Sequence, residues 1–175
     1  MSVAQRSTDV YGQELVRLVT EMARLHEELA MHMRNKLDAI KRADSDQIQS
    51  ITARETVLAE RLTEREGLRR QMTKRILAGV GLNAEANKSI RLTELAEHFA
   101  EPRRSQLLVA AAGLREKVHE VDRIRVTTTL ITEEMLKHMR EVFSVMTAGG
   151  FETGVYSRTG GRLEATSPRV FEAVG

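Results

Sequence analysis

The sequence predicts an all-α fold: an elongated antiparallel helical hairpin or coiled coil packed with a long C-terminal helix, followed by a short irregular tail. Long stretches of helical periodicity run without a proline. Aromatic residues make up only 3% of the 175 residues, whereas charged residues make up 30%. This balance is typical of long helices in thin layers. We expect one helical domain at residues 1–150 and a flexible tail at 151–175.

The first long helix is predicted at about residues 9–42. Asp9 is the expected N-cap. Apolar residues follow at alternating steps of four and three, the seam of a coiled-coil helix: Tyr11, Leu15, Leu18, Met22, Leu25 and Leu29. At about 1.5 Å per residue, this helix would be roughly 50 Å long.

A second helix is predicted at about residues 46–78, after a tight turn. The stretch "KRADSDQIQS" ends one helix with basic residues and offers Asp44, Ser45 and Asp46 as caps for the next. A looser apolar stripe then runs from Ile48 to Ile76, and the glycines of "AGVGL" end the helix. The second helix is therefore expected to fold back along the first.

A short connector helix is expected at about 89–99, before the last long helix at about 102–148. Pro102 occupies the favoured first position of that last helix, and Gly149 and Gly150 end it. Its length would be roughly 70 Å. Four β-branched residues at 126–129 predict a bend or soft spot. Glycines inside the predicted helices mark either helix crossings or frayed turns: Gly12, Gly67 and Gly113.

Several classes of function find no support in the residues. The absence of cysteine excludes disulfides and thiolate zinc sites and fits a reducing cytosol. No apolar run approaches the roughly 20 residues of a membrane span, so we expect a soluble, cytoplasmic protein. The Glu116-x-x-His119 element of di-iron bundles has no second copy, and nucleophile elbows and phosphate loops are lacking. We expect no metal, no cofactor and no enzymatic activity.

A basic run on the second helix has two readings: Arg61, Arg65, Arg69, Arg70, Lys74 and Arg75. It could meet nucleic acid or an acidic partner, or it could form an exposed face of salt bridges. Glutamates interleave with it and aromatic stacking residues are missing, which favours the salt-bridged face.

The end of the last helix carries the candidate partner-binding site. Apolar residues recur there at steps of four and three, with Phe143 beside them, and methionine is flexible enough to accept helices of varying sequence: Ile131, Met135, Met139, Val142, Phe143 and Met146. This face either receives a partner's amphipathic helix or packs on the first two helices as ordinary core. A helix of roughly 70 Å on a hairpin of roughly 50 Å leaves part of its length uncovered.

Four motifs in this order resemble the FlgN family of flagellar export chaperones. They are "Ala-Asp-x-Asp-x-Ile" at 43–48, "Arg-Glu-x-x-Leu" at 54–58, "Leu-Thr-Glu-Leu-Ala" at 92–96, and Tyr156-x-x-x-Gly160 after the last helix. The resemblance covers nearly the whole chain.

The resemblance implies a cytoplasmic type III export chaperone. Such a protein binds the amphipathic C-terminal helix of the hook-filament junction proteins FlgK and FlgL, prevents their premature assembly, and delivers them to export-apparatus components such as FliJ. Tyr156 would either contact the client or export gate, or pin the tail. The alternative function is a structural coiled-coil adaptor without a role in export. Neither nucleic acid nor membrane insertion is expected, and unused seam leaves a homodimer open.

Overall fold

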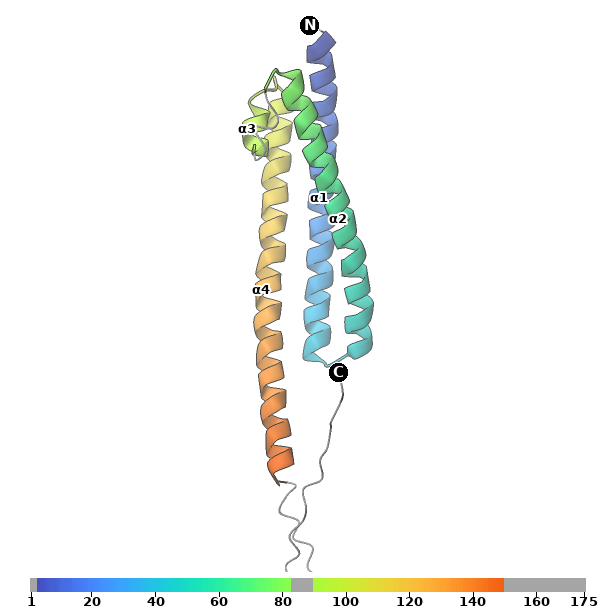
Figure 1. Cartoon of the computed structure of the whole chain (residues 1–175), viewed down its shortest axis with the longest axis vertical. Coiled ribbons are helices and arrows are strands. Elements are labelled where there is room, and N and C mark those ends of the chain that lie inside the picture. Colours follow the sequence, from blue (N-terminus) through green and yellow to red (C-terminus); the bar gives the residue numbers. More distant parts are fainter. Residues whose placement is uncertain (1–2, 83–89, 150–175) are drawn as a thin grey trace, which may run out of the picture. The chain divides into compact units, whose positions relative to one another are not determined.

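A computed structural model describes residues 3–82 and 90–149 of the chain, and the elements in these ranges are all helices. They are α1 (Val3–Lys41), α2 (Ser45–Gly79), α3 (Leu92–Ala96) and α4 (Arg103–Gly149) (Figure 1). The described part of the chain contains no strand, which confirms the all-α prediction. The chain divides into two compact units, residues 1–130 and 131–175, and the boundary lies within α4. The predicted tail at 151–175 lies outside the described residues.

The first two helices form the predicted antiparallel hairpin (Figure 1). At its turn, the Asp44 carboxylate accepts a hydrogen bond from the Gln47 backbone N–H at 3.1 Å, so Asp44 caps α2 as predicted. At the far end, Gly81 adopts a positive φ of 77°. The Leu82 N–H then donates to the Leu77 carbonyl at 2.9 Å, and the Gly81 N–H donates to the Ala78 carbonyl at 3.2 Å. This Schellman geometry is the reason that glycine ends the helix.

Three predicted boundaries were wrong. Asp9 is not an N-cap, because α1 begins at Val3 and no proline or glycine interrupts it before Asp9. Its carboxylate instead accepts a hydrogen bond from Arg103 Nε at 3.4 Å. The connector helix α3 is shorter than expected, since only Leu92–Ala96 are helical. Pro102 lies just before α4, where its carbonyl accepts a bond from the Gln106 N–H.

The hydrophobic core of the first unit lies where all four helices meet. Its buried side chains come from α1, from the end of α2, from α3 and the turn after it, and from the start of α4: Leu15, Val19, Ile76, Leu77, Leu95, Ala96, Phe99 and Leu107. Gly12 marks a crossing there, since a Cβ at this position would lie 2.5 Å from Phe99 Cε1. A Cβ at Gly67 or Gly113 would have no atom within 4 Å, so neither glycine is needed for a close contact.

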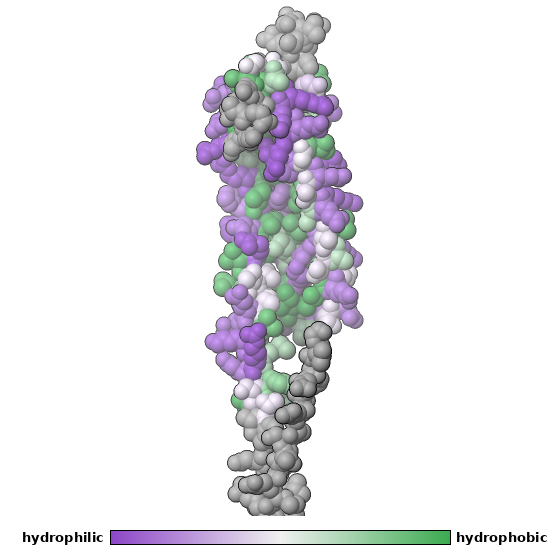
Figure 2. Space-filling view, in the orientation of Figure 1, coloured by the Kyte–Doolittle hydropathy of each residue, from purple (hydrophilic) through white to green (hydrophobic). Residues whose placement is uncertain are grey.

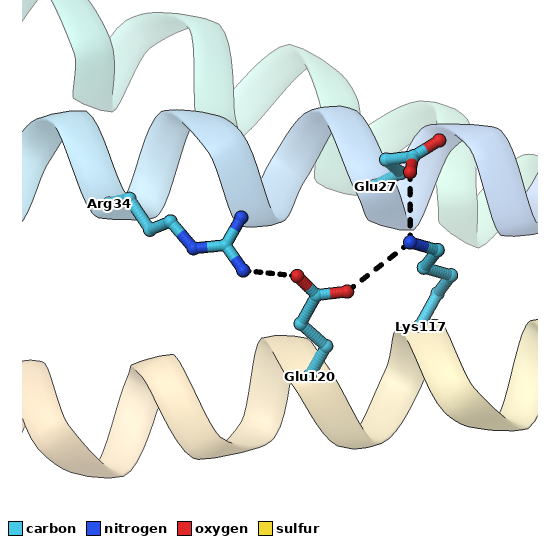
Figure 3. Close-up of polar contacts among 4 residues, drawn as sticks. All are labelled: Glu27, Arg34, Lys117 and Glu120. Carbon is cyan, nitrogen blue, oxygen red and sulfur yellow. Dashed lines mark hydrogen bonds and ion pairs between the residues drawn. The ribbon is translucent and has the colours of Figure 1, made fainter.

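Beyond Leu107, half-buried apolar side chains and a set of ion pairs connect α4 to the rest of the first unit. No residue of α4 between 108 and 130 is buried. Lys117 Nζ lies 2.8 Å from Glu27 Oε1 of α1 and 3.4 Å from Glu120 Oε2, and Glu120 also pairs with Arg34 of α1 (Figure 3). We call these four residues the α1–α4 ion network. The helix itself continues through the β-branched residues 126–129.

The pKa values of this network follow from its contacts. The hydrogen bond from Arg34 is the main reason that the pKa of Glu120 lies below its usual value, with the charge of Lys117 adding to the effect. The hydrogen bond to Glu27 likewise raises the pKa of Lys117. Figure 2 shows hydrophobic and hydrophilic residues side by side on one face of the first unit, so apolar surface there is not confined to the interior.

Candidate functional site

The candidate site lies in the second unit, on the last part of α4. Ile131 and Met135 are half-buried. Met139, Phe143 and Met146 expose 64%, 68% and 70% of their surface, and Val142 is exposed as well. We call these six residues the α4 stripe: Ile131, Met135, Met139, Val142, Phe143 and Met146.

Helix geometry places most of the α4 stripe on one face. At about 100° per residue, Met135, Met139, Val142 and Met146 fall within a narrow arc, and they span about 16 Å along the axis. Exposed apolar residues that are contiguous in this way mark interaction surfaces more often than isolated ones do. Three of the six side chains are unbranched methionines and Phe143 is aromatic, so the stripe offers a large contact area with adaptable packing.

Sequence reasoning missed two exposed apolar residues of this segment, Leu136 and Val145. They were missed because the steps of four and three follow a single face, and these two lie outside it. The available signal was the composition of 130–146, where apolar residues occur on more than one side of the helix. The apolar surface of this helix is therefore wider than the predicted stripe.

The polar residues around the α4 stripe carry charges of both signs. Glu133, Glu134 and Glu141 alternate with Lys137 and Arg140, and all five are exposed. Within residues 131–147 no ion pair is formed by these groups. A mixed, solvated rim of this kind fixes orientation and solubility, while the apolar face supplies most of the binding energy.

The basic run on α2 is mainly the predicted salt-bridged face. Glu66 accepts bonds from Arg69 at 2.7 Å and from Arg70 at 2.9 Å. The hydrogen bond with Arg69 is the main reason that the pKa of Glu66 is lowered, although partial burial opposes it. Arg65 pairs with Glu21 of α1 at 3.0 Å, which ties the two helices of the hairpin together.

The other features weighed from the sequence are a metal site, Tyr156 and a membrane span. Glu116 and His119 are exposed, and within the described ranges no group of three or more potential ligands could hold a metal ion. Tyr156, the last predicted site residue, lies outside the described residues, and its role stays a prediction. No helix of residues 3–82 or 90–149 is both long and apolar enough to cross a bilayer.

Comparison with known proteins identifies the family. The model of the FlgN family, described as FlgN protein, matches residues 11–164, which include most of α1, all of α2, α3 and α4, and Tyr156. No curated protein and no solved structure matches the chain. The matched range covers well over half of the sequence and includes the positions of all four motifs. The chain therefore belongs to the FlgN family, whose general role is that of a flagellar export chaperone.

Proposed function

We propose that the α4 stripe holds the amphipathic C-terminal helix of a flagellar export client in the cytoplasm before export. The clients are the hook-filament junction proteins FlgK and FlgL, which the chain keeps from premature assembly and delivers to export-apparatus components such as FliJ. The observation that carries this proposal is the exposure of Met139, Phe143 and Met146, three large apolar side chains on one short segment. Family membership supports the general role.

The physical reason is mutual burial of two apolar faces. A client helix that will later pack against its neighbours in the filament exposes an apolar face while it is unassembled. Covering that face on the α4 stripe releases about 25 cal/mol per Å² of apolar surface, from which the ordering of both partners must be subtracted. The complex is therefore stable enough to block self-association and weak enough to release the client.

Flexible side chains suit a surface that accepts more than one client. Methionine repacks against different partner side chains at little cost, because its thioether chain rotates freely. We include Tyr156 in the binding site, as a ring that contacts the client helix or the export gate just beyond α4. The function as proposed requires no catalysis, no nucleotide and no metal.

A direct test measures binding of labelled C-terminal peptides of FlgK and FlgL to the purified chain by fluorescence anisotropy. Met139→Asp places a charge in the α4 stripe and is expected to weaken binding at least about tenfold, since a buried unpaired charge is costly. Ser144→Asp adds the same charge to an exposed position on the other side of the same helix, and it should leave binding unchanged.

The alternatives give different results. If neither peptide binds, the client assignment is wrong and a coiled-coil adaptor becomes the better function. If Met139→Asp and Ser144→Asp weaken binding equally, the peptides bind elsewhere. Light scattering across a range of protein concentrations tests the homodimer, and a dimer that Met139→Asp dissociates would show that a second copy covers the α4 stripe.

A further inference from the structure

A groove runs between α1 and α2 near the turn of the hairpin, entirely within the first unit. It consists of two adjoining cavities of about 450 and 540 Å³. Met31, His32 and Arg54 line both cavities, so the two form one continuous groove. We call it the hairpin groove. None of its residues belongs to the α4 stripe.

The hairpin groove combines an apolar base with a rim that is partly apolar and partly charged. Ile51 and Leu58 of α2 are buried at its base. Met31 of α1 and Val57 of α2 both line it, with 48% and 47% of their surface exposed. A seam between two helices normally buries its large apolar residues and surrounds them with polar ones. Here two outer positions, Met31 and Val57, are apolar too, so this part of the groove presents a surface for another side-chain layer.

The charges along the groove are unbalanced. Its acidic residues have nitrogen-bearing neighbours: Asp38 Oδ1 lies 3.4 Å from Lys41 Nζ, and Glu28 Oε1 lies 3.9 Å from His32 Nε2. Arg54 and Arg61, by contrast, have no carboxylate within ion-pair distance among the residues that the structure describes. They are one heptad apart on α2, about 10 Å along the axis, with Val57 between them.

His32 adds a polar group to the wall of the groove. It is only 9% exposed, it lines both cavities, and its ring makes no hydrogen bond within the described ranges. Its one charged neighbour is Glu28, at a distance longer than a hydrogen bond. Its ring nitrogens are not among the buried atoms that lack a partner, so a polar group that approaches from the open side of the groove can reach them.

We propose that the hairpin groove docks an amphipathic helix of a second protein, with aliphatic residues against Met31 and Val57 and carboxylates one heptad apart against Arg54 and Arg61. A helix fits because a groove between two packed helices receives the side-chain ridge of a third. The carboxylates supply the charges that the two arginines lack. This surface is independent of the client surface proposed above.

The charges also argue against a second copy of this chain as the occupant. Two-fold pairing of groove with groove would place Arg54 and Arg61 of one copy near the same arginines of the other. The carboxylates of the groove, Asp38 and Glu28, already have neighbours of their own, so the like charges of the arginines disfavour such a pairing. Nucleic acid is a poorer fit as well, because no Phe, Tyr or Trp side chain lines the groove for a base to stack on.

The test uses two designed helical peptides with the same leucine stripe at steps of three and four. The acidic probe carries glutamates beside the stripe one heptad apart, and the basic probe carries lysines at those positions. Binding to the full chain is measured by anisotropy, and the site is read from the ¹³C-methyl signals of the methionines. The Met31 signal is assigned with a Met31→Leu variant.

We expect the acidic probe to bind at least about tenfold more tightly than the basic probe and to shift the Met31 signal, with Met139 and Met146 unchanged. Arg54→Glu plus Arg61→Glu should reverse the preference between the probes. Val57→Asp should abolish binding of both. Arg115→Glu plus Arg123→Glu, two exposed arginines of α4, is the matched charge control and should change nothing. Circular dichroism verifies that each variant is folded.

Three results would overturn the proposal. The first is equal binding of the two probes. The second is a shift at Met139 or Met146 in place of Met31, which would mean that the probe occupies the α4 stripe. The third is a concentration-dependent Met31 shift without any probe, which would identify a second copy in the groove. Binding of the client peptides should survive Arg54→Glu plus Arg61→Glu, so failure here is distinguishable from failure of the proposed function.

Discussion

The core of the first unit and the α4 stripe show the same kind of sequence pattern but differ in burial. Both consist of large apolar residues at helical spacing. Leu15, Leu77 and Leu95 are buried, because α1, α2 and α3 each contribute one layer to the same cluster. Met139 and Phe143 are exposed. Apolar periodicity therefore says which face of a helix avoids water, and only the presence of a second layer says whether that face is structural or available for binding.

The largest expected difference between the two regions is the cost of truncating a side chain. Leu95→Ala removes a fully buried leucine of α3 and should lower the free energy of unfolding by about 2–5 kcal/mol. Met139→Ala truncates an exposed residue and should change it by no more than about 0.5 kcal/mol. Urea denaturation of both variants measures this. Similar losses would mean that the α4 stripe is part of a core.

Adding one methyl group at a glycine compares a tightly packed position, Gly12, with an open one, Gly67. Gly12→Ala places a Cβ against the Phe99 ring and should destabilise the chain by about 1–3 kcal/mol, because the ring must move. Gly67→Ala meets no neighbouring atom and should stabilise α2 by about 0.5–1 kcal/mol through helix propensity. Thermal unfolding compares the two. Phe99→Leu should recover part of the loss in Gly12→Ala, and no recovery would locate the strain elsewhere.

The α1–α4 ion network differs from both regions, since it connects α1 and α4 through charged side chains that are not buried. The lowered pKa of Glu120 means that its contribution is present at neutral pH and is lost as pH falls through a folded-state pKa below 4.5. The raised pKa of Lys117 means that its contribution is lost as pH rises through a folded-state pKa above 10.5. The network therefore holds α4 to α1 between these limits.

Hydrogen exchange of α4 amides near Glu120, corrected for intrinsic rates, tests this window. Glu120→Gln should reduce protection at pH 7 and leave protection in strong acid unchanged. Raising the salt concentration to 1 M should shrink the effect of the substitution, because exposed charges are then screened within about 3 Å. Unchanged protection in Glu120→Gln at pH 7 would show that the half-buried apolar contacts of α4 suffice.

The smallest effect is expected on the salt-bridged face of α2. Glu66→Gln removes the acceptor shared by Arg69 and Arg70 and should cost at most about 1 kcal/mol at pH 7, since partly exposed ion pairs are weak. The pKa of Glu66 is lowered, so its contribution disappears as pH falls through its folded-state value, below 4.5. Unfolding curves of wild type and Glu66→Gln should converge in acid. A constant difference at every pH would point to lost packing of the side chain.

The two binding surfaces differ in how far the sequence predicts them. The α4 stripe lies on one helix, so its spacing is visible in one stretch of sequence. The hairpin groove was missed, because Met31 and Val57 stand outside the apolar stripes of their own helices. They become a surface only when the turn at Asp44 brings α1 and α2 together. Among the residues that the structure describes, the same pairing leaves Arg54 and Arg61 with no carboxylate within ion-pair distance.

The sequence by itself determined the helices, the hairpin turn and the family, because caps, glycines and apolar spacing act over a few residues. Asp44 begins α2 and Gly81 ends it for reasons that are local to the chain. The tertiary structure decided which apolar residues are buried and which charges find partners. Burial and pairing depend on residues far apart in sequence: Phe99 fills the space at Gly12, and Glu120 meets Arg34. No pattern within a single helix contains that information.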